Sequence, residues 1–152
     1  MNIIGSKGNI DKLSLFNSNS DALDADFSEF NFKNINITSA KNDCADFSAG
    51  EYKIFNSLFQ NCGDKALSIG EKSIANLDNI IVKNSKYGVA SKDGSKTYLI
   101  NSKLEDLNIC YSAYRKKQEF FGSLISLKNN ICKNYFKEVE FDLYSNAIIL
   151  KQ

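Results

Sequence analysis

The segment Asn79-Ile80-Ile81-Val82-Lys83-Asn84 decides the fold, because versions of it recur along the chain. Each copy opens with Asn, continues with β-branched, aromatic or other apolar residues, and most close with a second Asn or Asp. The other copies begin at Asn34, Asn56, Asn101 and Asn129. From Asn34 onward, the first asparagines are separated by 22, 23, 22 and 28 residues. A repeat of this length indicates a solenoid, a propeller or another array.

A second marker keeps the same spacing. Asp21-Ala22-Leu23-Asp24, Asp43-Cys44-Ala45-Asp46 and Asp64-Lys65-Ala66-Leu67 follow one another at offsets of 22 and 21 residues. The apolar runs between markers are short, rich in Ile, Val, Phe and Tyr, and bounded by turn residues, which is typical of strands. Helical spacing and a Leu-x-x-Leu-x-Leu frame are both absent. The pattern therefore predicts an all-β parallel β-helix of about six coils, about 22 residues each, with the asparagines in an inward ladder.

Composition favours one domain covering residues 1–152, either complete or a module of a longer chain. Apolar residues make up 43% of the chain, charged residues make up 24%, and the net charge is +1. This balance gives no electrostatic reason to expect nucleic acid as a partner. The first residues lack the features of a secretory signal, and no run is apolar and long enough to predict a membrane span. The compartment stays open.

The four cysteines are expected to be free thiols. Counted from the first Asn of their copies, Cys44, Cys62, Cys110 and Cys132 lie at different positions. Cysteines on adjacent coils are then offset by four to six residues along the strand path, on the order of 13 Å, which exceeds the reach of a disulfide.

The repeated cassettes carry a resemblance. Residues 20–24, 63–71, 90–95 and 114–120 resemble the repeats of bacterial right-handed parallel β-helix proteins in the pectin-lyase-like superfamily. The resemblance implies a right-handed β-helix and an association with extracellular or cell-surface polysaccharide. Polygalacturonase-like members carry His and adjacent Asp residues, and this chain has neither. Pectate-lyase-like members use calcium held by acids, with Arg or Lys as the base, and that chemistry stays open.

The repeated aspartates are the candidate metal ligands. Stacking of the cassettes would place acids on consecutive coils, about 5 Å apart, where they would bind a cation, recruit Lys65 or stay solvated. Calcium suits such a site because it accepts six to eight oxygen ligands. The alternative is that these residues cap turns through bonds to backbone amides. The candidate set is Asp21, Asp24, Asp43, Asp46 and Asp64.

The longest interval contains the candidate ligand-binding residues. The 28 residues from Asn101 to Asn129 exceed the repeat by about six, which predicts an insertion between Cys110 and Ser123. Aromatic and cationic side chains on a protruding loop could stack on sugar rings and bind their acidic groups. The alternative is a loop whose aromatics fold back over the coil. The candidates are Tyr111, Tyr114, Arg115, Lys116, Lys117, Phe120 and Phe121.

Three functions remain open. The first is a non-catalytic module that binds polysaccharide or acts as a rigid surface spacer. The second is a calcium-dependent lyase or hydrolase acting on acidic polysaccharide, with Asp43, Asp46 and Asp64 as ligands and Lys65 or Arg115 as base. The third is an interaction protein whose open coil end pairs with another chain, end to end. The missing catalytic motifs favour the first.

Overall fold

A computed structural model describes residues 1–150, which form twelve strands. None of these residues forms a helix that could cross a membrane. The strands are β1 (Asn2–Ile4), β2 (Lys7–Ser18), β3 (Leu23–Asp26), β4 (Glu29–Ala40), β5 (Ala45–Ser48), β6 (Glu51–Gly70), β7 (Ile74–Lys92), β8 (Lys96–Ile100), β9 (Lys103–Tyr114), β10 (Leu124–Lys128), β11 (Ile131–Phe141) and β12 (Asn146–Leu150).

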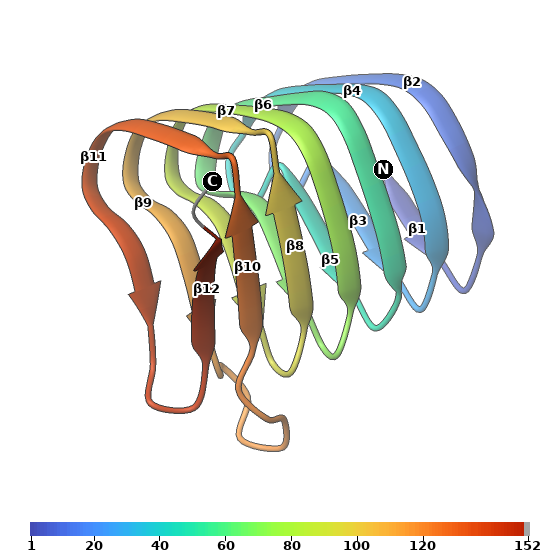
Figure 1. Cartoon of the computed structure of the whole chain (residues 1–152). Helices are drawn as coiled ribbons and strands as arrows, with labels where there is room; N and C mark the ends of the chain where they lie inside the picture. The colour runs from blue at the N-terminus through green and yellow to red at the C-terminus, as the bar shows by residue number, and fades with distance from the viewer. Residues whose placement is uncertain (151–152) are drawn as a thin grey trace.

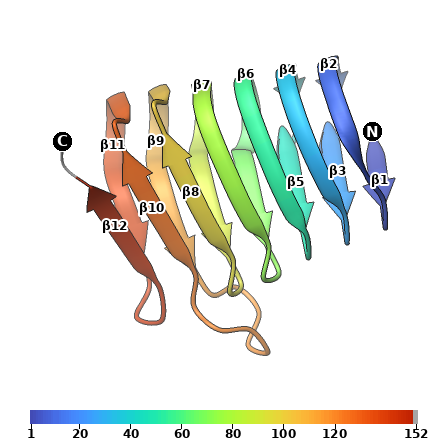
Figure 2. The same cartoon turned by 45° about the vertical axis from the view of Figure 1, so that its right-hand side comes forward.

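The strands stack as a parallel β-solenoid of about seven turns (Figures 1 and 2). Every strand pair is parallel, and paired residues lie about 22 positions apart, as in Asn2 beside Asp24 and Glu29 beside Glu51. Across the coil that contains the insertion the offset is 28, as in Lys96 beside Leu124. The predicted fold class and period are confirmed. The predicted count of about six coils was one too low, because β1 and β12 also join the stack.

Each coil has three faces. β2, β4, β6 and β7 run from face 2 into face 3 without a break, and β6, β7, β9 and β11 run from face 3 into face 1. Face 1 contains β1, β3, β5 and residues 67–70, 89–92, 111–114 and 139–141. Face 2 contains residues 7–11, 29–33, 51–55 and 74–78, with β8, β10 and β12. Face 3 contains residues 13–18, 35–40, 57–62, 80–85, 103–109 and 131–137.

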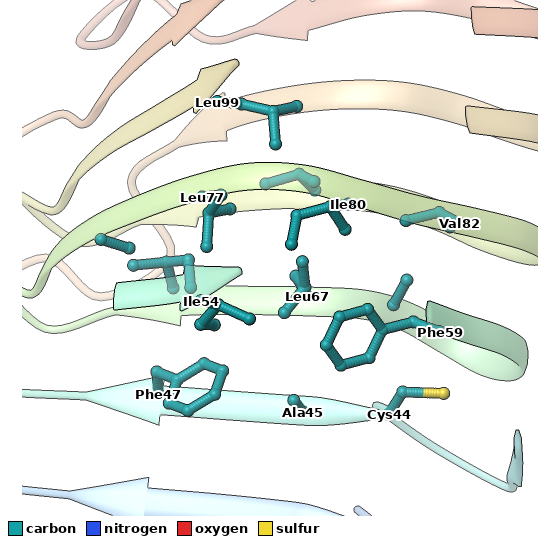
Figure 3. Close-up of a cluster of buried hydrophobic side chains, with 14 of the residues drawn as sticks. Cys44, Ala45, Phe47, Ile54, Phe59, Leu67, Leu77, Ile80, Val82 and Leu99 are labelled. Atoms are coloured by element: carbon teal, nitrogen blue, oxygen red, sulfur yellow. The ribbon is translucent and has the colours of Figure 1, made fainter. Parts of the chain in front are cut away.

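The core fills the space between the faces with alternate side chains of each strand (Figure 3). Phe32, Phe47 and Tyr52 are fully buried, and the rings of Phe47 and Tyr52 lie 4.7 Å apart. The Tyr52 hydroxyl donates to the carbonyl of Ala25 at 2.8 Å, so the one polar atom of this aromatic group is satisfied. Strand alternation thus produces one continuous apolar interior.

The asparagine ladder faces solvent, so the predicted inward ladder was wrong. Asn56, Asn79 and Asn101 occupy one column with φ angles of 50°, 54° and 52°, at the corner between faces 2 and 3. The Asn79 side-chain amide donates to the Asn56 carbonyl oxygen at 2.9 Å, whereas that of Asn101 donates to Asp78. Asn tolerates this left-handed conformation better than most residues, and the corner turns its side chain outward.

Two disulfides replace the four free thiols that the sequence suggested. Cys44 pairs with Cys62, with a Cα–Cα distance of 5.3 Å, and Cys110 pairs with Cys132 at 6.4 Å. The expectation failed because it measured separation along the strand path. A coil bends between faces 3 and 1, so two inward positions several residues apart along that path approach each other through the interior. Figure 3 shows the Cys44 sulfur within the apolar core, near Phe59.

Candidate functional site

The aspartate column on the face 3 to face 1 corner contains Asp21, Asp43 and Lys65 rather than three acids. The backbone amide of Asp43 donates to Asp21 Oδ1 at 2.9 Å, and that of Lys65 donates to Asp43 Oδ1 at 2.9 Å. Asp64 lies one position away, where its backbone amide donates to the carbonyl of Asn42. The offset of 21 residues, rather than 22, had already separated Asp64 from the other two.

Lys65 compensates part of the negative charge at this corner. Its Nζ donates to Asp64 and lies 3.5 Å from Asp43 Oδ1, while Lys86 Nζ lies 3.6 Å from Asp64 on the other side. Burial raises the pKa of Asp43 and outweighs the opposing charge of Lys65. Burial also works to raise the pKa of Asp64, but the hydrogen bond and charge from Lys65, with Lys86, reverse the direction and lower it. For Lys65, burial alone would lower the pKa, yet Asp64 and Asp43 raise it.

A second acidic column lies on the outer side of face 1. Asp24 is the register partner of Asp46, with Asp26 two residues along β3. Burial, followed by the charges of Asp26, Asp46 and Asp21, raises the pKa of Asp24. Lys92 Nζ lies 3.7 Å from Asp46 Oδ1, although Lys92 belongs to a strand two coils further on. Lys92 therefore compensates part of the negative charge at Asp46, whereas Asp24 is repelled by the neighbouring carboxylates.

The five candidate metal ligands do not converge on one point. Within residues 1–150, no three Asp, Glu, Cys or His side chains form a group that could hold a metal ion. Asp21 and Asp43 instead accept bonds from backbone amides, which are the contacts of the capping alternative, and Lys65 is recruited as the sequence allowed. Calcium binding stays an untested prediction.

The insertion begins later than the sequence suggested. Tyr111 and Tyr114 still belong to β9, where they pair with Val89 and Lys92. Tyr111 is 2% exposed and lies in the interior, so its ring offers no surface for a sugar. Tyr114 is half-buried, and burial raises its pKa to about 12. The segment that leaves the coil is residues 115–123, named here the insertion loop, which projects below the turns in Figure 1.

Backbone hydrogen bonds fix the first part of the insertion loop. The amide of Arg115 donates to Asp142 Oδ2 at 2.8 Å, and the amides of Lys116 and Lys117 both donate to Asp93 Oδ1 at 2.7 Å. Asp93 is 2% exposed, so these bonds are shielded from water. The loop is thus held by carboxylates from the coil before it and the coil after it.

The side chains of the insertion loop combine cations with aromatic rings. The Arg115 guanidinium lies 3.6 Å from the centre of the Tyr144 ring. Lys72 and Lys117 place Nζ 5.7 and 6.0 Å from the centre of the Phe120 ring, and Lys117 also pairs with Glu71. Phe121 projects outward and is 80% exposed. Part of the loop folds back over the coil, and part of it is available to a ligand.

Sequence reasoning missed Lys72, Asp93, Asp142 and Tyr144. They lie in the turns that precede and follow the insertion, between faces 1 and 2. Aligning those turns by the repeat would have placed them beside the loop, but no motif marks them. Comparison with family models, curated proteins and solved structures gave no match.

Proposed function

We propose that this protein is a non-catalytic β-solenoid module that binds acidic polysaccharide through the insertion loop. The observation that carries the proposal is Phe121, an 80% exposed ring on a loop whose backbone is anchored at Asp93 and Asp142. A large apolar ring in water, on a segment already held in place, loses little conformational freedom when it binds a flat ligand face.

The charges around Phe121 favour an anionic sugar. Arg115, Lys116 and Lys72 carry positive charge at this end of the turns, and Lys116 is exposed. The guanidinium of Arg115 retains a planar set of donors suited to a carboxylate while it stacks on Tyr144. Glu119 in the loop and Glu71, Asp93 and Asp142 beside it balance these cations. The preference for an anionic sugar therefore rests on the positions of the exposed Lys116 and of the Arg115 donors, not on net charge.

The acidic corner supports a structural role better than a catalytic one. A general base at neutral pH needs a pKa near the working pH, and the carboxylates around Lys65 raise its pKa instead. Asp43 already accepts the amide of Lys65, and Asp64 is engaged by two lysines. The calcium-dependent lyase or hydrolase is therefore the weaker proposal.

The two disulfides support action in an oxidising compartment, because disulfides persist there and are rare in reducing cytosol. This agrees with the cell-surface association implied by the resemblance. Right-handedness, bacterial origin and membership of the pectin-lyase-like superfamily stay part of the proposal.

The test measures binding of polygalacturonate, with uncharged dextran as the negative polymer, by isothermal titration calorimetry. Phe121→Ala and Arg115→Gln should each weaken binding about tenfold or more, a loss of ~1.4 kcal/mol or more. Phe136→Ala is the matched control, because Phe136 is 90% exposed on face 3, far along the coil from the insertion loop. Equal loss in the control, or no loss at Phe121, would overturn the proposal. Release of unsaturated or reducing ends, with or without calcium, would favour the enzyme instead.

A further inference from the structure

The last coil ends in an uncovered interior. A cavity of about 440 Å³ opens there, lined by Tyr111, Leu127, Ile149 and Glu138 among others. The Tyr111 hydroxyl is buried and makes no hydrogen bond with any residue from 1 to 150. Ile149 belongs to the inward column of face 2, after Leu127, yet it is 57% exposed. The column therefore stops with apolar surface in water.

The edges of β11 and β12 are also unpaired. Within residues 1–150, β11 bonds only to β9 and β12 only to β10, so the outer edge of each strand has no strand partner among these residues (Figure 1). Large side chains along these strands are exposed, among them Tyr135 at 43% and Phe141 at 58%. An open parallel edge of this kind can accept another parallel strand.

The first coil provides the complementary edge. Among the described strands, β1 bonds only to β3, and β2 only to β4. The inward residues Ile10, Leu13 and Leu15 are only partly buried against the core. Continuing the register beyond the last coil would place Ile3 after Phe141, Ile10 after Ile149 and Leu15 after Cys132. In each of these columns an apolar side chain of the last coil would then be followed by an apolar side chain of the first coil of the other copy.

The side-chain ladders have a direction that matches this arrangement. In each rung the amide donates toward the preceding coil, as Asn84 does to Asn61 at 2.8 Å and Asn134 does to Asp106 at 3.1 Å. The Asn134 oxygen accepts nothing from residues 1–150, so the last coil presents an acceptor. Asn17 occupies the same column in the first coil, where its amide has no side-chain partner in that range and presents a donor.

We propose that copies of this chain stack head to tail, with the first coil of one copy covering the last coil of the next. β1 would then pair with residues 140–142, residues 7–11 with β12, and residues 13–18 with residues 130–135. The contact joins two different surfaces, so it does not close on itself and generates linear oligomers. It does not depend on the insertion loop, which lies in the turns between coils.

The test uses two variants that each block one end. Ile149→Asp puts a carboxylate in the open inward column of the last coil, and Ile10→Asp does the same in the first coil. Ile148→Asp is the matched control, because Ile148 is the adjacent residue of β12, follows Ser126 on the outer side of the face and is 45% exposed. Circular dichroism establishes that each variant keeps its strand content, and analytical ultracentrifugation measures mass against concentration.

The wild type and Ile148→Asp should form a concentration-dependent series of oligomers of the 17.0 kDa chain. Ile149→Asp and Ile10→Asp should each stay monomeric over the same range, with association weakened about tenfold or more. Mixing these two variants should give a dimer, because each retains the end that the other lacks. Monomeric wild type, equal effects of Ile148→Asp and Ile149→Asp, or self-association of Ile10→Asp would overturn the proposal. The outcome is independent of polygalacturonate binding.

Discussion

The disulfides provide the sharpest prediction, because they reverse what the cysteine spacing suggested. Cys44 and Cys62 are 18 residues apart, and Cys110 and Cys132 are 22 apart. In the chain-entropy model, a closed loop of either size stabilises the folded state by ~3 kcal/mol. A chain of 152 residues unfolds with an entropy of roughly 0.3 kcal/mol per kelvin. Loss of one bridge should therefore lower Tm by about 10 °C.

The assay compares oxidised protein with protein that was reduced while unfolded and refolded under reductant. Reduced protein should melt well below oxidised protein, and Cys44→Ala/Cys62→Ala should lose part of that response. The oxidised chain should expose no titratable thiol after denaturation without reductant. Four titratable thiols, with a Tm that is indifferent to reductant, would refute the pairing and restore the expectation drawn from the repeat.

Two further predictions concern the charged columns. Because burial and neighbouring carboxylates raise the pKa of Asp24, its protonated form favours folding below the unfolded pKa, and this contribution is lost as pH rises through the folded pKa. Asp24→Asn should therefore raise the free energy of unfolding at pH 7 by up to ~1 kcal/mol, and this gain should shrink below about pH 4. Glu119→Gln, a control in the exposed loop, should leave the free energy of unfolding unchanged at both pH values. Urea unfolding measures both variants. Lys65→Met leaves the buried carboxylate of Asp43 uncompensated and should destabilise by ~3 kcal/mol. Adding Asp43→Asn should recover most of that loss, and an additive double variant would show that the two side chains do not interact.

The fold could be predicted from the sequence because the repeat length equals the number of residues that the backbone needs for one coil. A residue and its partner about 22 positions later occupy one column, as in Asn56 and Asn79, so the spacing of markers reports the stacking directly. Strand alternation then separates inward from outward residues within each face. The Asn column was placed correctly, but its direction depended on the φ angle at the corner, which the pattern of residues does not give.

The errors at the candidate sites share a physical cause. Assigning a residue to a column requires knowing the register to a single residue. Asp64 lies one position from the column that contains Lys65, so the assignment of Asp64 failed. Contacts across the interior, such as Cys44 with Cys62, depend on the bend of a coil rather than on distance along it. The insertion was located to the correct interval, but its start depended on how far β9 continues pairing, which places Tyr114 in the strand and Arg115 outside it.

The charged side chains at the face 3 to face 1 corner are buried, whereas those of the insertion loop include exposed ones. This difference favours a structural role for the corner and supports the proposed binding role for the loop. At the corner, Lys65 and Asp43 are 9% and 3% exposed. Their side chains interact with each other, and Asp43 also accepts a backbone amide. At the insertion loop, Asp93 and Asp142 accept the backbone amides of Arg115, Lys116 and Lys117, and side chains such as Phe121 and Lys116 stay exposed. A ligand gains most from groups that are already positioned and still lack protein partners. The buried charges therefore hold neighbouring coils together, and the exposed side chains of the insertion loop are the groups on which the proposed binding rests.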